Sequence, residues 1–233
     1  MKRFTIILSA CVLCLLTVTP GFAASDMAKL NGRLNDAATV IKQIMATPDK
    51  SIPGSILSSA TCVAVIPSYK KGAFIVGAQY GQGVVTCRTR RGWSAPTFVQ
   101  LAGGSFGFQI GGQATDLVLI AVNNKGMQDL LRSKVKLGGN ASVAAGPVGR
   151  TGTAATSLNL KAELLSYSRS QGIFAGIDLS GSTFTQNTDD TRTFYGSNIP
   201  FSTILGGDTP TPASAQPFVR TVARYFVRAR ADN

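Results

Sequence analysis

The stretch that decides the fold runs from Leu137 to Gly152 and reads L-G-G-N-A-S-V-A-A-G-P-V-G-R-T-G. It is rich in glycine, alanine and small polar residues, and it contains no acidic residue and no cysteine. Glycine at this density permits bulges, positive φ angles and close approach of neighbouring backbones. The stretch is therefore typical of a Gly-rich strand and turn in a compact β domain. Any function built on it would depend on backbone amides and shape.

A phosphate-binding P-loop does not fit this stretch. That motif requires Lys and then Ser or Thr after its last glycine. Here Arg150 and Thr151 follow Gly149, and the upstream spacing is also wrong.

The pattern of strands extends on both sides of the Gly-rich stretch. An apolar run covers Cys62 to Ile66, and a second, Leu117 to Val122, predicts a strand buried on both faces. Short Gly-punctuated strands are predicted within 134–145, 152–168 and 172–185. The short connections between them indicate antiparallel pairing.

Helices are predicted around these strands. Residues 25–46 have apolar residues at helical spacing, and Ser25 is a candidate N-cap. Shorter helices are expected near Ile56 and at 124–132 and 187–195. These helices are too few and too separated for a doubly wound fold. We therefore expect an α+β fold: a single domain with a strongly bent, barrel-like antiparallel sheet and flanking helices.

The two ends of the chain differ from this central part. Residues 1–23 have the basic start, apolar segment and small-residue cleavage pattern of a signal peptide, which predicts a mature chain beginning at Ala24. A lipoprotein signal ending at Cys11 and a retained membrane anchor are the alternatives. We expect a domain over 24–205, a Pro/Thr linker over 206–217 and a basic amphipathic helix over 218–233.

Composition removes most kinds of catalytic site. The chain has no histidine, and Glu163 is its only glutamate. Histidine is the commonest general base and the commonest metal ligand. We therefore expect no enzyme activity, no metal and no cofactor, although a pair of Asp residues brought together by the fold stays open.

Net charge indicates the kind of partner. Removal of Lys2 and Arg3 with the signal peptide lowers the net charge from +12 to +10, which favours anionic partners. The candidate lipid-binding residues form three clusters, each of which could instead be a solvated charged face. The first lies on the N-terminal helix, the second follows if 72–80 and 83–88 pair across a turn at Gly81-Gln82, and the third lies on the C-terminal helix. Their members are Lys29, Arg33 and Lys42; Lys70, Lys71, Arg88, Arg90 and Arg91; and Arg220, Arg224 and Arg228.

Several motifs along the chain resemble those of the SYLF domain family. Within that family, this sequence is similar to the exported bacterial members. Besides the Gly-rich stretch, the match includes Lys71–Phe74 with Gly81–Val85, Gly92–Pro96, Gly107–Gly111 with Thr115–Val118, Ser166–Ser168 with Gly172–Gly176, and Phe194–Gly196. The resemblance covers roughly residues 30–205.

The resemblance implies a binding module. Eukaryotic SYLF domains are linked to phosphoinositide-rich membranes through an N-terminal amphipathic segment, and residues 25–46 match it in place. An exported protein would not meet actin or cytosolic phosphoinositides, so neither is expected as a ligand.

The sequence is consistent with two functions. The first is a non-catalytic module that binds anionic phospholipid surfaces in the periplasm or cell envelope. The second is a structural or interaction protein of the envelope that binds an acidic partner protein or lipopolysaccharide. Nucleic acid is not expected, because export removes the opportunity to meet it.

The cysteines carry one further prediction. Cys62 and Cys87 are the two that would remain after cleavage, and an oxidising compartment favours a disulfide between them. In a flat three-stranded meander they would lie about 9–10 Å apart, beyond disulfide reach. The bond therefore requires either that they lie on neighbouring strands or that the sheet curls sharply.

Overall fold

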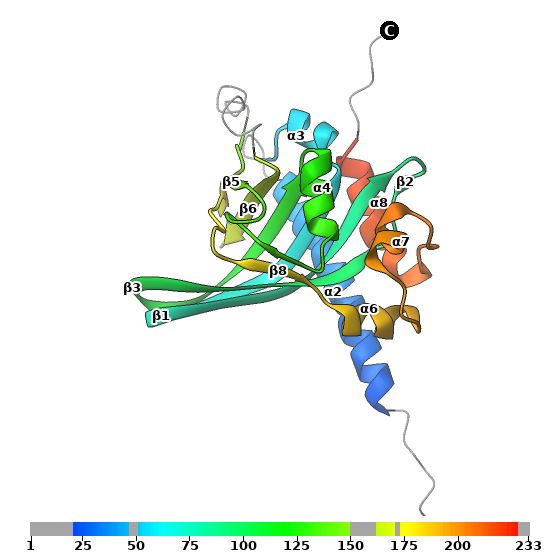
Figure 1. Ribbon diagram of the computed structural model, residues 1–233, viewed down its shortest axis with the longest axis horizontal. Coiled ribbons are helices and arrows are strands. Elements are labelled where there is room, and N and C mark those ends of the chain that lie inside the picture. The colour runs from blue at the N-terminus through cyan, green and yellow to red at the C-terminus, as the bar shows by residue number, and fades with distance from the viewer. Residues whose placement is uncertain (1–20, 47–50, 150–161, 171–172, 228–233) are drawn as a thin grey trace, which may run out of the picture.

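Two long strands, β1 (Cys62–Thr89) and β3 (Thr97–Ala121), form the frame of the domain (Figure 1). The computed structural model describes residues 21–46, 51–149, 162–170 and 173–227. The predicted signal segment before residue 21 and the predicted strand residues 152–161 lie outside these ranges. Within them, the predicted class is confirmed: helices flank a strongly curled sheet in one α+β domain.

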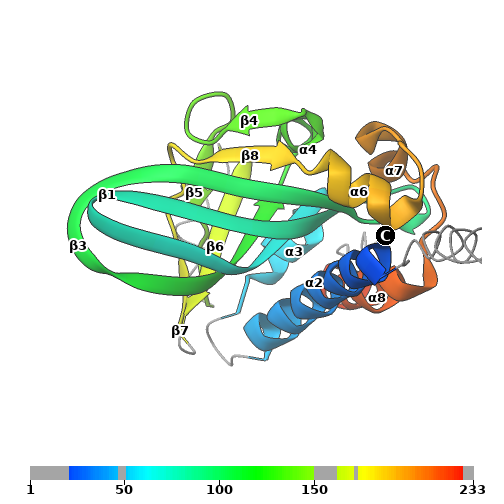
Figure 2. The ribbon, with the colours of Figure 1, turned by 90° about the horizontal axis from the view of Figure 1, so that it is seen from below.

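The β1–β3 ribbon curls back on itself. The two strands pair antiparallel from Cys62 opposite Ala121 to Val85 opposite Thr97. Figure 2 shows the ribbon as an elongated ring in which the two ends of β1 meet. At that meeting point the Arg88 amide donates to the Thr61 carbonyl over 2.7 Å. A flat sheet could not bring these residues together, so the curl is the feature that decides the topology.

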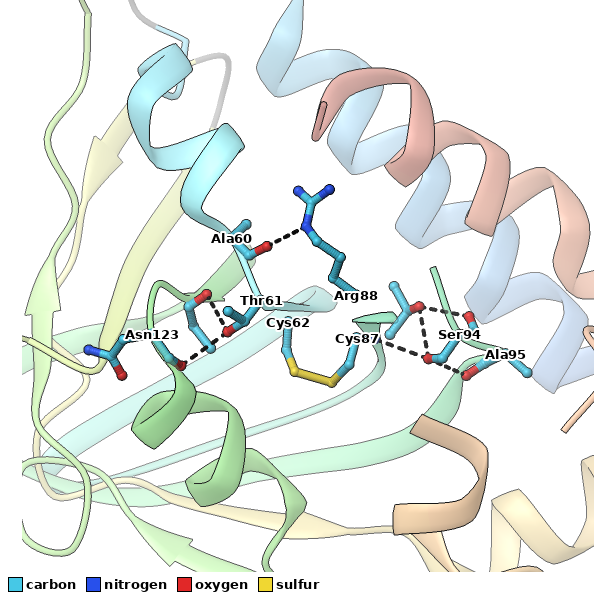
Figure 3. Close-up of a disulfide and its surroundings, with 10 residues drawn as sticks. Ala60, Thr61, Cys62, Cys87, Arg88, Ser94, Ala95 and Asn123 are labelled. Atoms are coloured by element: carbon cyan, nitrogen blue, oxygen red, sulfur yellow. Dashed lines mark hydrogen bonds between the residues drawn. A yellow bond between two sulfur atoms is a disulfide. The ribbon is translucent and has the colours of Figure 1, made fainter. Parts of the chain in front are cut away.

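The predicted disulfide lies where the ring closes (Figure 3). Cys62 and Cys87 are bonded with their Cα atoms 4.0 Å apart. Both are fully buried in the core. Of the two arrangements that the bond required, the structure has the sharp curl, because both cysteines belong to the same strand.

Short strands complete the sheet. They are β2 (Gly92–Trp93), β4 (Lys134–Lys136), β5 (Val143–Ala145), β6 (Leu164–Ser170), β7 (Ile173–Gly176) and β8 (Thr183–Gln186). β6 and β8 pair with different parts of β3, and β4 adds to β8. Pairing is antiparallel except for β5 with β6, which is parallel. The expected antiparallel pairing is wrong for this one pair. The two strands are separated in sequence by residues 146–163, a connection as long as parallel pairing needs.

The described helices are seven segments, one of them 3₁₀. They are α2 (Gly21–Met45), α3 (Gly54–Ser59), α4 (Asn124–Leu131), α6 (Thr188–Tyr195), α7 (Phe201–Gly206), the 3₁₀ segment η1 (Ala213–Ala215) and α8 (Gln216–Tyr225). The predictions for α3, α4 and α6 are confirmed. Ser25 does not cap α2, because α2 already includes the residues from Gly21 onward. Ala23 and Ala24 are strong helix formers, which favours this earlier start.

The sheet has a hydrophobic core on each face. Val118 and Ile120 contribute to the core shared with α2 and α8, whereas Leu117 and Leu119 contribute to the core shared with α4 and α7. Successive residues of a strand point to opposite faces, so this strand must be apolar at every position. The prediction that Leu117 to Val122 is buried on both faces holds from Leu117 to Ala121, while Val122 is half-buried.

The Gly-rich stretch acts through shape, as its composition indicates. Gly146 lies directly against the ring of buried Tyr167, and a Cβ at residue 146 would lie 2.1 Å from the Tyr167 Cζ atom. Only glycine fits this contact. The stretch is therefore a packing element of the β5–β6 region.

Candidate functional site

A basic groove of about 480 Å³ lies between α2 and β1. The α2 side supplies Lys29, Arg33 and Asp36. On the β1 side, the lining comes from both arms of the curled strand: Pro67, Ser68 and Lys70, then Tyr80, Gly81 and Gln82. The curl thus brings together residues that are ten or more positions apart on one strand.

Arg33 forms the inner wall of the groove and is held in place from three directions. Its Nη1 pairs with Asp190 Oδ2 of α6 at 2.5 Å, and its Nη2 donates to Gln82 Oε1 over 2.8 Å. Its guanidinium also lies 5.5 Å from the centroid of the Phe98 ring. The side chain is only 15% exposed. Arg33 therefore joins α2, α6 and β1, and Asp190 neutralises its charge.

Lys29 and Lys70 supply the accessible positive charge of the groove. The Lys29 side chain is 71% exposed, and its surface ion pair with Asp26 at 3.1 Å leaves it largely hydrated. Lys70 is exposed on the opposite wall. Lys29 and Lys70 line opposite walls, with Tyr80 46% exposed beside them and the exposed Asp36 carboxylate on the α2 wall. The two ammonium groups attract an anionic group, and Asp36 opposes part of that attraction.

A backbone irregularity places Lys70 on this wall. The register of β1 against β3 shifts between Ile66 and Tyr69, and Ser68 there has a φ of 52°. The Ser68 amide donates to Asp116 Oδ1 over 3.0 Å, which offsets the loss of a ladder hydrogen bond. Bulges of this kind re-aim side chains next to functional surfaces.

The predicted second cluster is divided by the fold. No turn occurs at Gly81-Gln82, because 72–80 and 83–88 belong to the one strand β1 and both pair with β3. The hairpin interpretation was therefore wrong. Lys70 joins the α2 residues in the groove, whereas the arginines of the cluster lie at the β1–β2 turn.

The arginines at the β1–β2 turn have two different roles. Arg88 donates to the carbonyls of Ala60 and Phe226, each over 2.9 Å, and lies 4.7 Å from the centroid of the Trp93 ring. These contacts join the closed end of the ribbon to the C-terminus of α8. Arg90 and Arg91 are exposed and line a separate hollow of about 840 Å³ between the β1–β2 turn, α4 and α7.

The remaining predicted cations lie apart from the groove. Lys42 is exposed near the C-terminal end of α2. Lys71 is half-buried; hydrogen bonds from Ser180, together with the charge of Lys71, hold the pKa of Asp178 below its usual range. Arg220 and Arg224 are exposed on α8, whereas Arg228 lies outside the described residues.

The terminal helix is docked on the protein. Phe218, Val222 and Phe226 are buried against the core that α2 also covers. Of the two interpretations of this helix, the structure shows the packed one with a solvated arginine face. Apolar insertion by Phe218 and Val222 would require α8 to leave the core.

The one glutamate belongs to a network that joins α4 to the Gly-rich stretch. Glu163 pairs with Lys125 Nζ, and Glu163 Oε2 accepts from the Ser142 amide over 2.7 Å. Burial raises the pKa of Glu163, but the hydrogen bonds from Lys125 and Ser142 outweigh it and leave the pKa below its usual range. Burial raises the pKa of the neighbouring Asp129. These acids are committed to contacts within the protein.

Sequence reasoning missed Tyr80 and Gln82 in the groove, and Asp190 as the ion-pair partner of Arg33. Tyr80, Gln82 and Asp190 were not predicted to join the cations of α2. Their positions follow from the curl of β1 and the docking of α6, and neither leaves a signal in local sequence. Among the described residues, no group of His, Cys, Asp and Glu is arranged to hold a metal ion. In the same part of the chain, no helix has the length and apolar character needed to cross a bilayer.

The fold and the groove define a class: an α+β domain with a curled two-stranded ribbon and a basic surface site beside its first long helix. The model of the Ysc84 family, described as "Las17-binding protein actin regulator", matches residues 102–225. The chain therefore belongs to the Ysc84 family, in agreement with the SYLF resemblance.

Individual relatives extend the match. SH3 domain-containing YSC84-like protein 1 of Homo sapiens is 38% identical over 171 residues, which cover 72% of this chain and 50% of the relative. Protein YSC84 of Saccharomyces cerevisiae is 35% identical over 190 residues, 79% of this chain and 40% of the relative. The chain thus spans half or less of these relatives. LAS seventeen-binding protein 3 of the same yeast is 35% identical over 193 residues, and its name describes binding to another protein.

Proposed function

We propose that this protein is a non-catalytic binding module for anionic phospholipid surfaces. The proposal rests on the groove of about 480 Å³ between α2 and β1, which Lys29 lines from α2 and which Lys70 and Tyr80 line from β1. A headgroup phosphate there would meet two ammonium groups, and the Asp36 carboxylate would weaken the attraction. Each basic residue near an anionic surface contributes up to about 1 kcal/mol, so binding should be weak and sensitive to salt.

The relatives' names do not decide the ligand of this chain. They describe Las17 binding and actin regulation in proteins of which this chain matches half or less. If residues 1–23 direct export, this protein acts in the periplasm or envelope, where neither partner occurs. Intact-mass measurement of the exported protein tests this: a chain beginning at Ala24 supports it, and a diacylglyceryl group on Cys11 would make it a lipoprotein.

Vesicle flotation tests the lipid proposal. Wild-type protein should float with phosphatidylglycerol vesicles and remain behind with pure phosphatidylcholine vesicles. Lys29→Gln/Lys70→Gln should lose most of this binding. Lys134→Gln/Lys136→Gln is the matched control, because it removes the same charge from exposed positions on β4. An equal loss of vesicle binding in both variants would show that binding depends on the net charge of the protein and not on the groove.

The hollow at the β1–β2 turn favours a second candidate function. Exposed Arg90 and Arg91 line about 840 Å³ on a different part of the surface from the groove. An envelope interaction protein would use such a surface for an acidic protein or for lipopolysaccharide. If Arg90→Gln/Arg91→Gln lost flotation while Lys29→Gln/Lys70→Gln floated like the wild type, the binding site would be this hollow and not the groove.

A further inference from the structure

Midway along their length, β1 and β3 bend back together, at residues 72–79 and 103–114. This bend is the far end of the ribbon, opposite the closed end, and it extends beyond the rest of the domain. Figures 1 and 2 both show this end projecting past the helices and the shorter strands. β3 pairs with β8 at residues 99–102 and with β6 at 116–121. Between these two segments its described partner is β1 alone. The outer edges of this two-stranded end are therefore free of described strands.

The packed core stops where the ribbon leaves the domain. A Cβ at Gly81 would lie 2.6 Å from Ile66 Cγ2, and one at Gly83 would lie 2.1 Å from the Val65 carbonyl oxygen. The two arms of β1 are thus in direct contact up to Gly81. Beyond that point one face of the ribbon becomes exposed, at Ala78 and Tyr80 on β1 and at Ala102 and Ala114 on β3, while Gln79 stays buried.

This end of the ribbon is also without charge. The sequence has no charged residue from Gly72 to Cys87 or from Gly92 to Thr115. This uncharged part of the sequence includes Phe74, Phe106 and Phe108. A projecting, uncharged and aromatic-rich ribbon is an aggregation hazard in water unless a partner covers it.

Charges and exposed apolar groups surround the point where the ribbon leaves the core. Lys70 and Lys71 precede the uncharged segment, and Lys70 also lines the groove. Tyr80 is 46% exposed on the ribbon itself. Ile173, the first residue of β7, is 69% exposed. It pairs with Ser170 of β6, and the preceding β6 residue, Arg169, pairs with Asp116 of β3. Lysine and tyrosine next to an apolar segment are typical of a membrane–water interface.

We propose that the far end of the ribbon, residues 72–79 and 103–114, enters the interfacial region of an anionic bilayer while the groove at its base holds a headgroup. This inference rests on the proposed lipid-binding function. From Tyr80 to Ile75 the strand reaches roughly 17 Å, enough to pass the headgroups. The free edges limit the depth, because unpaired backbone groups cannot enter the hydrocarbon core. The ribbon therefore lies about 5–10 Å into the headgroup and acyl boundary and does not span.

Depth-dependent quenching tests this placement. Trp93, the one tryptophan of the chain, is replaced by Phe, and a new probe is introduced as Phe74→Trp or Phe106→Trp. Each variant is mixed with phosphatidylglycerol vesicles that contain phosphatidylcholine brominated at carbons 6 and 7 or at carbons 11 and 12. Both probes should be quenched, and more strongly by the shallower bromines. Trp93 in the unsubstituted protein, which packs 5.9 Å from Phe226, should not be quenched.

A flotation series accompanies the quenching. Phe106→Ser/Phe108→Ser should weaken binding to the same vesicles about tenfold with an unchanged melting temperature, because apolar contact with the membrane is lost. Flotation of the probe variants without quenching would overturn the ribbon inference and leave the proposed function intact. Absence of flotation at low salt would overturn both. A dimer that Phe106→Ser/Phe108→Ser converts to a monomer, seen by light scattering without lipid, would make this end an interface between copies and also overturn the inference.

Discussion

The two ends of the β1–β3 ribbon share strands and pairing but differ in everything around them. At the closed end, Cys62 and Cys87 are bonded, and both faces of the strands are buried in hydrophobic cores. At the far end, the ribbon projects from the domain, and Ala78, Ala102 and Ala114 at its boundary are exposed. Backbone pairing alone therefore does not distinguish a structural strand from a surface one. The difference is in what each face contacts, and it separates stability at one end from proposed binding at the other.

The groove lies between these two ends and combines both properties. Arg33 and Asp190 are part of the packed structure, whereas Lys29 and Lys70 are exposed to solvent. Substitutions toward the closed end should reduce stability, and substitutions toward the far end should reduce binding. The predictions below test that separation, beginning with the largest effect.

Removal of the disulfide should have the largest effect. The bond joins residues 25 positions apart, so Cys62→Ala/Cys87→Ala should lower the free energy of unfolding by about 3–4 kcal/mol in the chain-entropy model. Urea denaturation of oxidised wild type and of the variant measures the difference. Reductant should destabilise the wild type and leave the variant unchanged. A wild type that is insensitive to reductant would show that the packed cores, without the bond, hold the ring closed.

Gly83 tests the contact between the two arms of β1. Alanine at residue 83 would place its Cβ 2.1 Å from the Val65 carbonyl oxygen, and the backbone there cannot yield easily. Gly83→Ala should therefore destabilise the protein by about 3 kcal/mol. Gly32→Ala is the matched control, because a Cβ at residue 32 of α2 meets no atom within 4 Å. The control should be stabilised by about 0.5–1 kcal/mol through helix propensity.

Parts of the fold that follow from local pattern could be predicted from sequence. The continuous apolar run at Leu117–Ala121 showed that β3 is buried on both faces, and three of the shorter helices were expected where they occur. The disulfide was predicted from the number of cysteines. The curl that makes it possible was left as one of two alternatives, because it depends on contacts such as Gly83 with Val65 that join residues 18 positions apart.

The candidate site was predicted by residue type more than by arrangement. Lys29, Arg33 and Lys70 were named, but in two different clusters, because the turn assumed at Gly81-Gln82 does not occur. The sequence also could not show that Arg33 has a structural role whereas Lys70 is exposed, because both appear in it only as basic residues. Burial and the Asp190 pair make Arg33 structural, and both depend on the packing of α6 against α2.

Arg33 sharpens this distinction between structural and exposed cations. Arg33→Gln should lower the free energy of unfolding by about 1.5 kcal/mol, because it removes charged hydrogen bonds to Asp190 and Gln82. Arg192→Gln breaks a 3.0 Å ion pair with Asp189 in which both side chains are exposed, so stability should change by less than about 0.5 kcal/mol. Chemical denaturation compares the two. Similar losses in both variants would remove the structural role assigned to Arg33.

The smallest effect is expected from the network around Glu163, and it concerns pH. Burial raises the pKa of Glu163, but the hydrogen bonds from Lys125 and Ser142 lower it by more than burial raises it, so the folded-state pKa lies below the unfolded value. A lowered carboxyl pKa stabilises the protein at pH values above the unfolded pKa, and this contribution is lost as the pH falls through the folded pKa. Asp129 opposes it, because burial raises its pKa and its protonation on acidification favours the folded state.

Glu163→Gln should therefore make stability less dependent on pH below about pH 4.3, and Asp129→Asn should make the acid loss begin at a higher pH. Urea midpoints measured from pH 7 to pH 3 test both slopes. Asp189→Asn is the control, because Asp189 is 82% exposed and its pair with Arg192 lies on the surface. Its pH profile should follow the wild type. If Glu163→Gln also follows the wild type, acid sensitivity arises elsewhere in the domain, and the contact between α4 and the Gly-rich stretch does not depend on the charge of Glu163.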